Sequence, residues 1–195
     1  MQYIAAKEYI LDRLRRELPP ELTYHGLHHT LDVVQVVAEL CKAEGVDPYE
    51  TRLLKTAACY HDCGFLVSNV NHEQLGCGIV RATLPRFKYT AKEIDRICAM
   101  ILATRIPQTP KNLLEEILCD ADLDYLGRDD FYSIGTTLYE EFQHYQIVEG
   151  EQDWNRLQVN FLKMHNFFTQ TSQARRRPRK LEHLHRIEDL VSTYR

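Results

Sequence analysis

Four side chains that can bind a metal ion interrupt the apolar faces of predicted helices, namely His29, His61, Asp62 and Asp122. Burying an isolated carboxylate is costly, so a buried carboxylate is usually paired, neutralised or bound to a metal. Taken singly, such residues are more often hydrogen-bonded core histidines, helix caps or ion-pair partners. Taken together, two imidazoles and two carboxylates on core-facing positions predict one shared divalent cation with two nitrogen and two oxygen ligands.

These faces follow from helical spacing. In the segment 48–62, apolar residues recur with the steps of one helix face, and the next step reaches His61 and Asp62. In the segment 111–126, Asp122 lies on the apolar face, whereas the aspartates two residues before and after it lie off that face. The pattern therefore selects one of three closely spaced aspartates for the site.

The order His … His-Asp … Asp in a helical chain resembles the HD-domain superfamily of metal-dependent phosphohydrolases. The likeness is carried by residues 24–33, 57–65, 71–73 and 119–123 and spans at least 24–126. The intervals are 32 residues from His29 to His61 and 60 from Asp62 to Asp122. The resemblance implies that these four residues hold a divalent ion, and Mn, Mg, Fe, Co, Ni or Zn suits such ligands.

The resemblance also implies roles for residues around the metal ligands. His25 would protonate the leaving alkoxide, and the alternative is a hydrogen bond at the start of a helix. Glu73 would position water and His72 would contact a phosphate or a second metal ion. The alternative for Glu73 is an acid favoured by the helix dipole. Thr104 and Arg105 are expected to contact the substrate phosphate, and Asp62 would orient the attacking water.

The implied activity is hydrolysis of a phosphate ester of a nucleotide or related small metabolite by metal-activated water. Two alternatives remain open. One is an HD-type di-iron oxygenase, which needs further histidine ligands, of which the chain offers His72. The other is a non-catalytic metal- or ligand-binding domain. The expected partner is a small phosphorylated substrate, and a homodimer also remains open.

Nine helices must position these residues, and no strand is predicted. The predicted segments are 2–18, 27–44, 48–62, 71–84, 90–103, 111–126, 129–148, 152–173 and 179–193. We expect an all-α fold with the metal site in its helical core. Residues 1–195 are expected to form one HD-type domain, with a motif core at about 24–126 and a C-terminal helical part at about 129–193. The run from Arg175 to Lys180 is predicted to be a solvated connector before the last helix.

Composition excludes several classes of protein. The 195 residues have a net charge of −4, with 27% charged and 44% hydrophobic residues, which is typical of a folded soluble chain. No apolar run approaches the roughly 20 residues that span a bilayer, so no membrane association is expected. The last 21 residues are basic but the remainder is acidic, so nucleic acid is not an expected partner. The six cysteines form no C-x-x-C pair and predict reduced thiols in a cytoplasmic protein.

Overall fold

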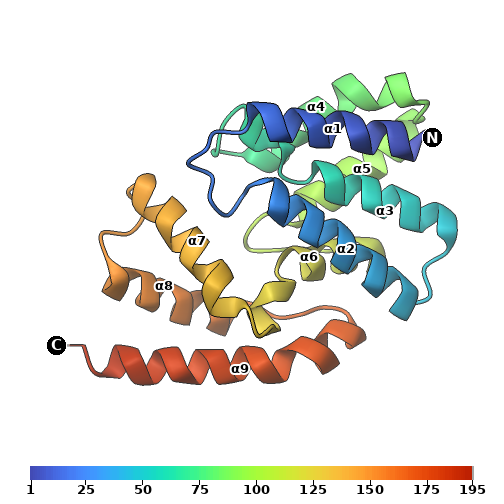
Figure 1. Cartoon of the computed structure of the whole chain (residues 1–195). Coiled ribbons are helices and arrows are strands. Elements are labelled where there is room, and N and C mark those ends of the chain that lie inside the picture. Colours follow the sequence, from blue (N-terminus) through green and yellow to red (C-terminus); the bar gives the residue numbers. More distant parts are fainter. Residues whose placement is uncertain (195) are drawn as a thin grey trace.

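The computed structural model describes residues 1–194, and these form nine α-helices and three short 3₁₀ helices with no β-strand (Figure 1). The α-helices are α1 (Tyr3–Glu17), α2 (Leu27–Ala43), α3 (Pro48–Tyr60), α4 (His72–Thr83), α5 (Ala91–Ala103), α6 (Leu113–Asp122), α7 (Phe131–His144), α8 (Glu151–Met164) and α9 (Gln170–Ser192). The 3₁₀ helices are η1 (Cys63–Leu66), η2 (Leu84–Phe87) and η3 (Asp124–Gly127). The prediction of an all-α fold is confirmed.

Side-chain caps explain where two of the helices that carry the site begin. The Asp47 carboxylate accepts hydrogen bonds from the backbone N–H groups of Tyr49 and Glu50 at the start of α3. At the start of α5, Thr90 and Glu93 form a reciprocal capping box. Each cap satisfies N–H groups that the first helical turn leaves unpaired, which is worth about 1 kcal/mol.

The helices divide into two groups with α6 between them. In Figure 1, α1 to α5 lie together on the side of the N-terminus, and α7 to α9 lie on the other side. Helix α6 packs against α2, α3 and α5, and η3 continues from its end to contact α7 and α9. The α6–η3 junction therefore links the two groups.

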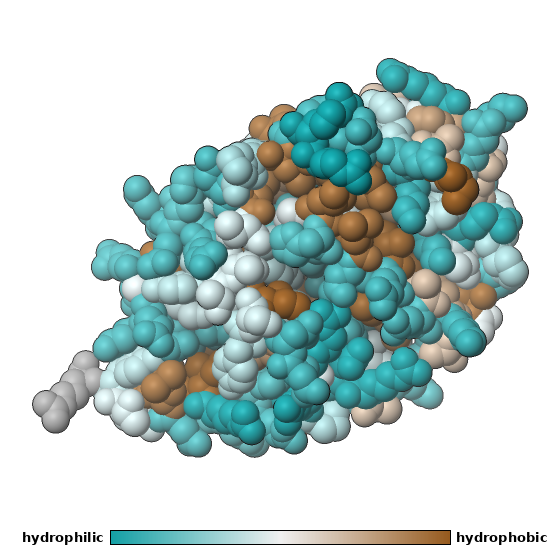
Figure 2. All heavy atoms as spheres, viewed as in Figure 1, coloured by the Kyte–Doolittle hydropathy of each residue, from teal (hydrophilic) through white to brown (hydrophobic). Residues whose placement is uncertain are grey.

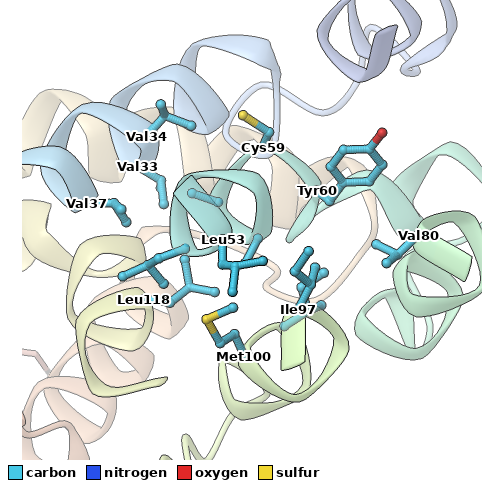
Figure 3. Close-up of a cluster of buried hydrophobic side chains, with 14 of the residues drawn as sticks. Val33, Val34, Val37, Leu53, Cys59, Tyr60, Val80, Ile97, Met100 and Leu118 are labelled. Carbon is cyan, nitrogen blue, oxygen red and sulfur yellow. The ribbon is translucent and has the colours of Figure 1, made fainter. Parts of the chain in front are cut away.

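Each group has its own apolar cluster. In the larger one, shown in Figure 3, Val33 and Val37 from α2 pack with Leu53 of α3, Ile97 of α5 and Leu118 of α6. These five side chains have no exposed surface, and each such burial contributes about 1.5–3 kcal/mol. The smaller cluster joins η3, α7, α8 and α9 and includes Leu126, Phe131, Leu162 and Leu184.

The predicted single helix over 152–173 is wrong, because the chain breaks between α8 and α9. Both carboxylate oxygens of Asp120 accept hydrogen bonds from this break, at 2.8 Å from the backbone N–H of Phe168 and 2.8 Å from that of Thr169. The Thr169 side chain then caps α9 by accepting from the backbone N–H of Ser172. A buried long-range partner has overridden the local helical pattern.

The predicted connector at 175–180 is also wrong, because these residues lie inside α9. Pro178 is tolerated within the helix although it offers no N–H to the helical ladder. Two of the arginines are held by ion pairs, at 2.7 Å from Arg176 to Asp124 and 2.8 Å from Arg179 to Asp129. The basic run is thus a helix face paired with acids rather than a free linker.

Two helices near the site end earlier than predicted. The segment 111–126 is divided into α6 and η3, and α3 ends at Tyr60 instead of residue 62. At the end of η3, a Cβ on Gly127 would lie 2.3 Å from the carbonyl oxygen of Arg176. Such a close approach of α9 requires glycine at the end of η3. Packing against α9, rather than helix propensity, therefore determines where η3 ends.

Most of the face shown in Figure 2 is hydrophilic, with separate hydrophobic patches. Within residues 1–194, no helix is both long enough and apolar enough to cross a membrane. All six cysteines are free and buried.

Candidate metal centre and adjoining cavity

Three helix ends bring two histidines and an aspartate together. His29 lies in the first turn of α2, His61 follows the last residue of α3, and Asp122 is the last residue of α6. His29 Nε2 lies 3.0 Å from Asp122 Oδ1 and 3.3 Å from His61 Nε2. The Nε2 of His61 is 3.4 Å from the same Asp122 oxygen. The three side chains offer ligand atoms within 4.8 Å of one another, a spacing compatible with one metal ion.

A backbone contact sets the proton position on His61. Its Nδ1 lies 2.9 Å from the carbonyl oxygen of Ala58, which can only accept, so Nδ1 carries the hydrogen. In the neutral ring, Nε2 then presents a lone pair to His29 and Asp122. This is the arrangement in which a backbone carbonyl orients an imidazole for metal binding.

Asp62 supplies a buried oxygen that needs a positive partner. Its Oδ2 lies 3.1 Å from His61 Nε2 and 3.5 Å from His29 Nε2. Nevertheless, Oδ2 is buried and has no hydrogen-bond partner among the described residues. A buried unpaired carboxylate oxygen is costly, and a cation between the ring nitrogens and carboxylates would remove that cost. The donor set therefore fits a divalent metal ion.

The short distances between the histidines and the carboxylates shift their pKa values. Burial disfavours the charged form of His61, but the Asp62 and Asp122 carboxylates outweigh it and raise its pKa well above the usual range. Burial likewise opposes ionisation of Asp122, yet hydrogen bonds and charge from His29 and His61 lower its pKa to about 2. A proton on His61 and a bound cation are thus alternative ways to neutralise the carboxylates.

His25 is held by an acid that the sequence analysis did not select. Its Nδ1 lies 2.5 Å from Oε1 of Glu141 in α7. The other oxygen of Glu141 accepts from the backbone N–H groups of Tyr24 and His25, at 2.9 and 3.0 Å. Burial lowers the pKa of His25, but the Glu141 hydrogen bond and the Asp62 charge outweigh it, so the pKa is raised. In the sequence, Glu141 shares a helix face with the apolar Leu138. An acidic residue on an apolar face was the pattern from which Glu141 could have been predicted as a site residue.

The start of α4 brings two further residues to the site. His72 Nε2 lies 3.7 Å from Asp62 Oδ1 and 3.5 Å from Glu73 Oε1. A Cβ on Gly64 would lie 1.8 Å from the carbonyl oxygen of His72, so η1 and α4 approach backbone to backbone. The Phe65 ring stacks on both His25 and His72, with centroids 4.4 and 4.2 Å away. Glycine and phenylalanine together fix the spacing between these two histidines.

Three alternate aspartates on α6 and η3 have three different surroundings. Asp122 faces the histidines. Asp120 is fully buried and also accepts from the hydroxyl of Thr169 at 2.7 Å. Asp124 pairs with Arg176. Only the middle aspartate contributes to the cluster, and its neighbours attach α9.

A cavity of about 170 Å³ adjoins the cluster. Its polar end is lined by His25, Asp62, His72, Glu73, Thr104 and Asp122, and the rest mainly by apolar residues of η3, α7 and α8. The Thr104 hydroxyl donates to the Ile101 carbonyl at 2.8 Å. Arg105 is exposed and lies outside the cavity lining. The structure therefore brings the predicted site residues together except Arg105, and their roles stay predictions.

Comparison with known proteins identifies a family and a shared fold. The family model of the HD domain matches residues 26–124. A predicted HD superfamily hydrolase from an uncultured Thermotogales bacterium has a similar crystal structure, with a TM-score of 0.63 and 19% identity over 95% of this chain and 91% of that one. A protein from Lactobacillus plantarum gives a TM-score of 0.69 at 18% identity, over 98% of this chain and 95% of the other. No curated protein matches the sequence. At these identities the two structures show the fold alone.

Proposed function

Because this chain belongs to the HD domain family, we propose that it is a metal-dependent phosphohydrolase acting on a phosphate ester of a nucleotide or related small metabolite. One observation carries the proposal. The buried, unpartnered Oδ2 of Asp62 lies beside two imidazoles at the polar end of a cavity. Such a donor set suits a divalent cation that faces a ligand.

His29, His61, Asp62 and Asp122 would hold the ion. A divalent ion bound there lowers the pKa of a water ligand and polarises a phosphoryl oxygen. The protein contributes fixed orientation, because Ala58 holds the ring of His61 and Asp122 contacts that of His29. Asp62 lines the cavity and would accept a hydrogen bond from the attacking water.

His25 is the proposed acid. The Glu141 carboxylate binds its Nδ1 and favours the protonated ring, so Nε2 can give a proton to the leaving oxygen. Glu141 touches neither substrate nor metal in this scheme and is a positioning residue. Glu73 and His72 would orient water and the phosphate from the start of α4, where helix N–H groups also favour an anion.

Thr104 and Arg105 are the proposed contacts for the substrate phosphate. Thr104 lines the cavity, and the exposed Arg105 follows it directly in the chain. A guanidinium can bind a phosphate through two parallel hydrogen bonds. The side chain of Arg105 would have to turn toward the cavity when substrate binds.

Phosphate release from a panel of phosphorylated metabolites, measured with Mn²⁺, Mg²⁺, Co²⁺ or Ni²⁺, tests the proposal. Asp62→Ala should lower turnover at least 100-fold while leaving the helical circular-dichroism signal intact. Asp95→Ala is the matched control, because Asp95 is exposed and pairs only with Arg81 at the surface. Oxygen-dependent turnover by protein carrying two coupled irons would instead identify an oxygenase and overturn the proposal.

A further inference from the structure

The cavity beside the candidate metal centre has two chemically different ends. Its histidines and carboxylates are at one end, on the loop before α2, the end of α3, α4 and the end of α6. The other end lies between α7 and α8, where its walls include Leu138, Phe142, Trp154, Leu157 and Phe161. A ligand with its phosphate at the polar end must therefore place the remainder of the molecule against apolar and aromatic side chains.

The charges around the cavity disfavour a ligand with several phosphates. Asp62, Glu73 and Asp122 line it, whereas no Lys or Arg does so among residues 1–194. A divalent ion would offset two of the three carboxylate charges, and His25 is already paired with Glu141. The cavity therefore has no surplus of positive charge, and every phosphate beyond the one that contacts the ion is disfavoured. A di- or triphosphate would add negative charge with no cationic side chain in the lining to meet it.

The size of the cavity restricts the group attached to the phosphate. Its volume of about 170 Å³ includes the polar end that would hold the phosphate, and an engineered apolar cavity of about 150 Å³ binds one benzene, so the cavity has room for no more than about one ring beside the phosphate. The apolar end offers few polar partners, and Gln158 is one of them. A single ring or a short alkyl chain fits this space and its chemistry. A ribose with its hydroxyl groups would leave most of its polar atoms unpaired, which is costly.

We propose that the substrate is a phosphomonoester with a single phosphate on a compact apolar group, an aryl or short alkyl alcohol, which binds between α7 and α8. The inference rests on the proposed function for the position of the phosphate. Within the proposed function it selects the phosphate ester of a small apolar metabolite over that of a nucleotide, and it assigns substrate selection to the C-terminal helices.

Binding of phosphonates tests this inference without turnover. Trp154 is the only tryptophan of the chain and lines the apolar end, so its fluorescence reports on occupancy. The probes are methyl-, ethyl-, butyl- and phenylphosphonate in saturating Mg²⁺, with adenosine 5′-triphosphate and adenosine 5′-monophosphate as comparison ligands. Each buried methylene should lower Kd about fourfold, so butylphosphonate should bind roughly 60-fold tighter than methylphosphonate. Phenylphosphonate should bind at least tenfold tighter than either nucleotide.

The variant Leu157→Arg provides a second test of the inferred substrate preference. The change places a cation in the apolar wall, so phenylphosphonate should bind at least tenfold more weakly and adenosine 5′-triphosphate more tightly. Leu190→Arg is the control, because Leu190 is 43% exposed on α9 and does not line the cavity. Circular dichroism of both variants verifies folding.

The two hypotheses can fail separately. A Kd that does not change along the alkyl series, or tighter binding of either nucleotide than of phenylphosphonate, overturns the inference even if phosphate esters are hydrolysed. If the phosphonates bind in the expected order but no ester is hydrolysed, the proposed function fails and the choice of ligand stands.

Discussion

At the scale of single residues, surroundings rather than residue type decide what each carboxylate does. Asp120, Asp122 and Asp124 are spaced two apart, yet one holds a loop, one faces two imidazoles and one pairs with an arginine. The helical spacing of apolar residues was sufficient to distinguish the middle one. It did not identify the partners of the other two, because these partners lie about 50 residues further along the chain.

Proton and metal compete at the cluster, which makes metal affinity dependent on pH. The carboxylates of Asp62 and Asp122 raise the pKa of His61 despite its burial, and a metal ion requires the neutral ring. Apparent metal affinity should therefore rise with pH until His61 is fully deprotonated. Titration calorimetry in buffers of different ionisation enthalpy should detect proton release on binding below the raised pKa. Binding of Mn²⁺ without proton release at any pH would contradict this.

The same competition predicts how chelation affects stability. In the metal-free protein, the raised pKa of His61 contributes stability at low pH that is lost as pH rises through the folded-state value. An ion at 100 times its Kd should add about 2.7 kcal/mol, or roughly 8 °C in Tm. Chelation should therefore lower Tm more at alkaline than at acid pH. The same decrease at both pH values would contradict the competition.

Glu141→Gln tests the positioning of His25. Loss of the carboxylate removes the interaction that favours the imidazolium, so the pKa of His25 should fall. Because an acid must be protonated, the alkaline decline of kcat should then shift to lower pH. Esters with poor leaving groups should slow about 100-fold and activated aryl esters far less. NMR titration of the His25 ring provides the direct measurement, and an unchanged pKa would assign Glu141 a purely structural role.

At the scale of elements, the apolar periodicity predicted which segments are helical, but it did not predict where several of these helices end. The helices and the capping box of Thr90 and Glu93 follow from local spacing. The break between α8 and α9 depends on Asp120, which is distant in sequence. His29, His61 and Asp122 lie together because helix ends meet, and both their core-facing positions and the resemblance to a known motif predicted that they would. Glu141 lay outside the motif and was missed.

Gly64→Ala tests the contact between η1 and α4. The added Cβ would overlap the His72 backbone, which cannot move without displacing the site. Overpacking and backbone strain should cost roughly 3 kcal/mol or more. Gly78→Ala is the control within α4, where nothing lies within 4 Å of the new Cβ, and it should stabilise the protein by about 0.5–1 kcal/mol. Urea unfolding gives the free energy of unfolding of both variants. Equal values would show that the contact between η1 and α4 does not require glycine at position 64.

At the scale of the whole molecule, the C-terminal helices complete the site rather than append to it. Helix α7 supplies Glu141 to His25, and α7 and α8 supply much of the cavity wall. Further attachment to the motif region runs through Asp120 and Asp124 on α6 and η3, close to the candidate metal centre. Several contacts between the two groups of helices therefore join the cavity wall to the candidate metal centre.

Asp120→Ala tests whether the motif region and the C-terminal helices unfold as the single domain that we predict. The substitution leaves three donors of Phe168 and Thr169, two of them buried, without an acceptor, which should cost about 3 kcal/mol and lower Tm by about 10 °C. Asp129→Ala is the control, because the side chain of Asp129 is 90% exposed in its ion pair, and it should change stability by less than about 0.5 kcal/mol. If the chain is a single domain, both the wild type and Asp120→Ala should unfold in one calorimetric transition. The fluorescence of Trp154 should then change at the same temperature as the helix content. Two separate transitions in the wild type, of which Asp120→Ala shifts only the first, would show instead that α7 to α9 form an independent unit and that the cavity lies at a boundary between domains.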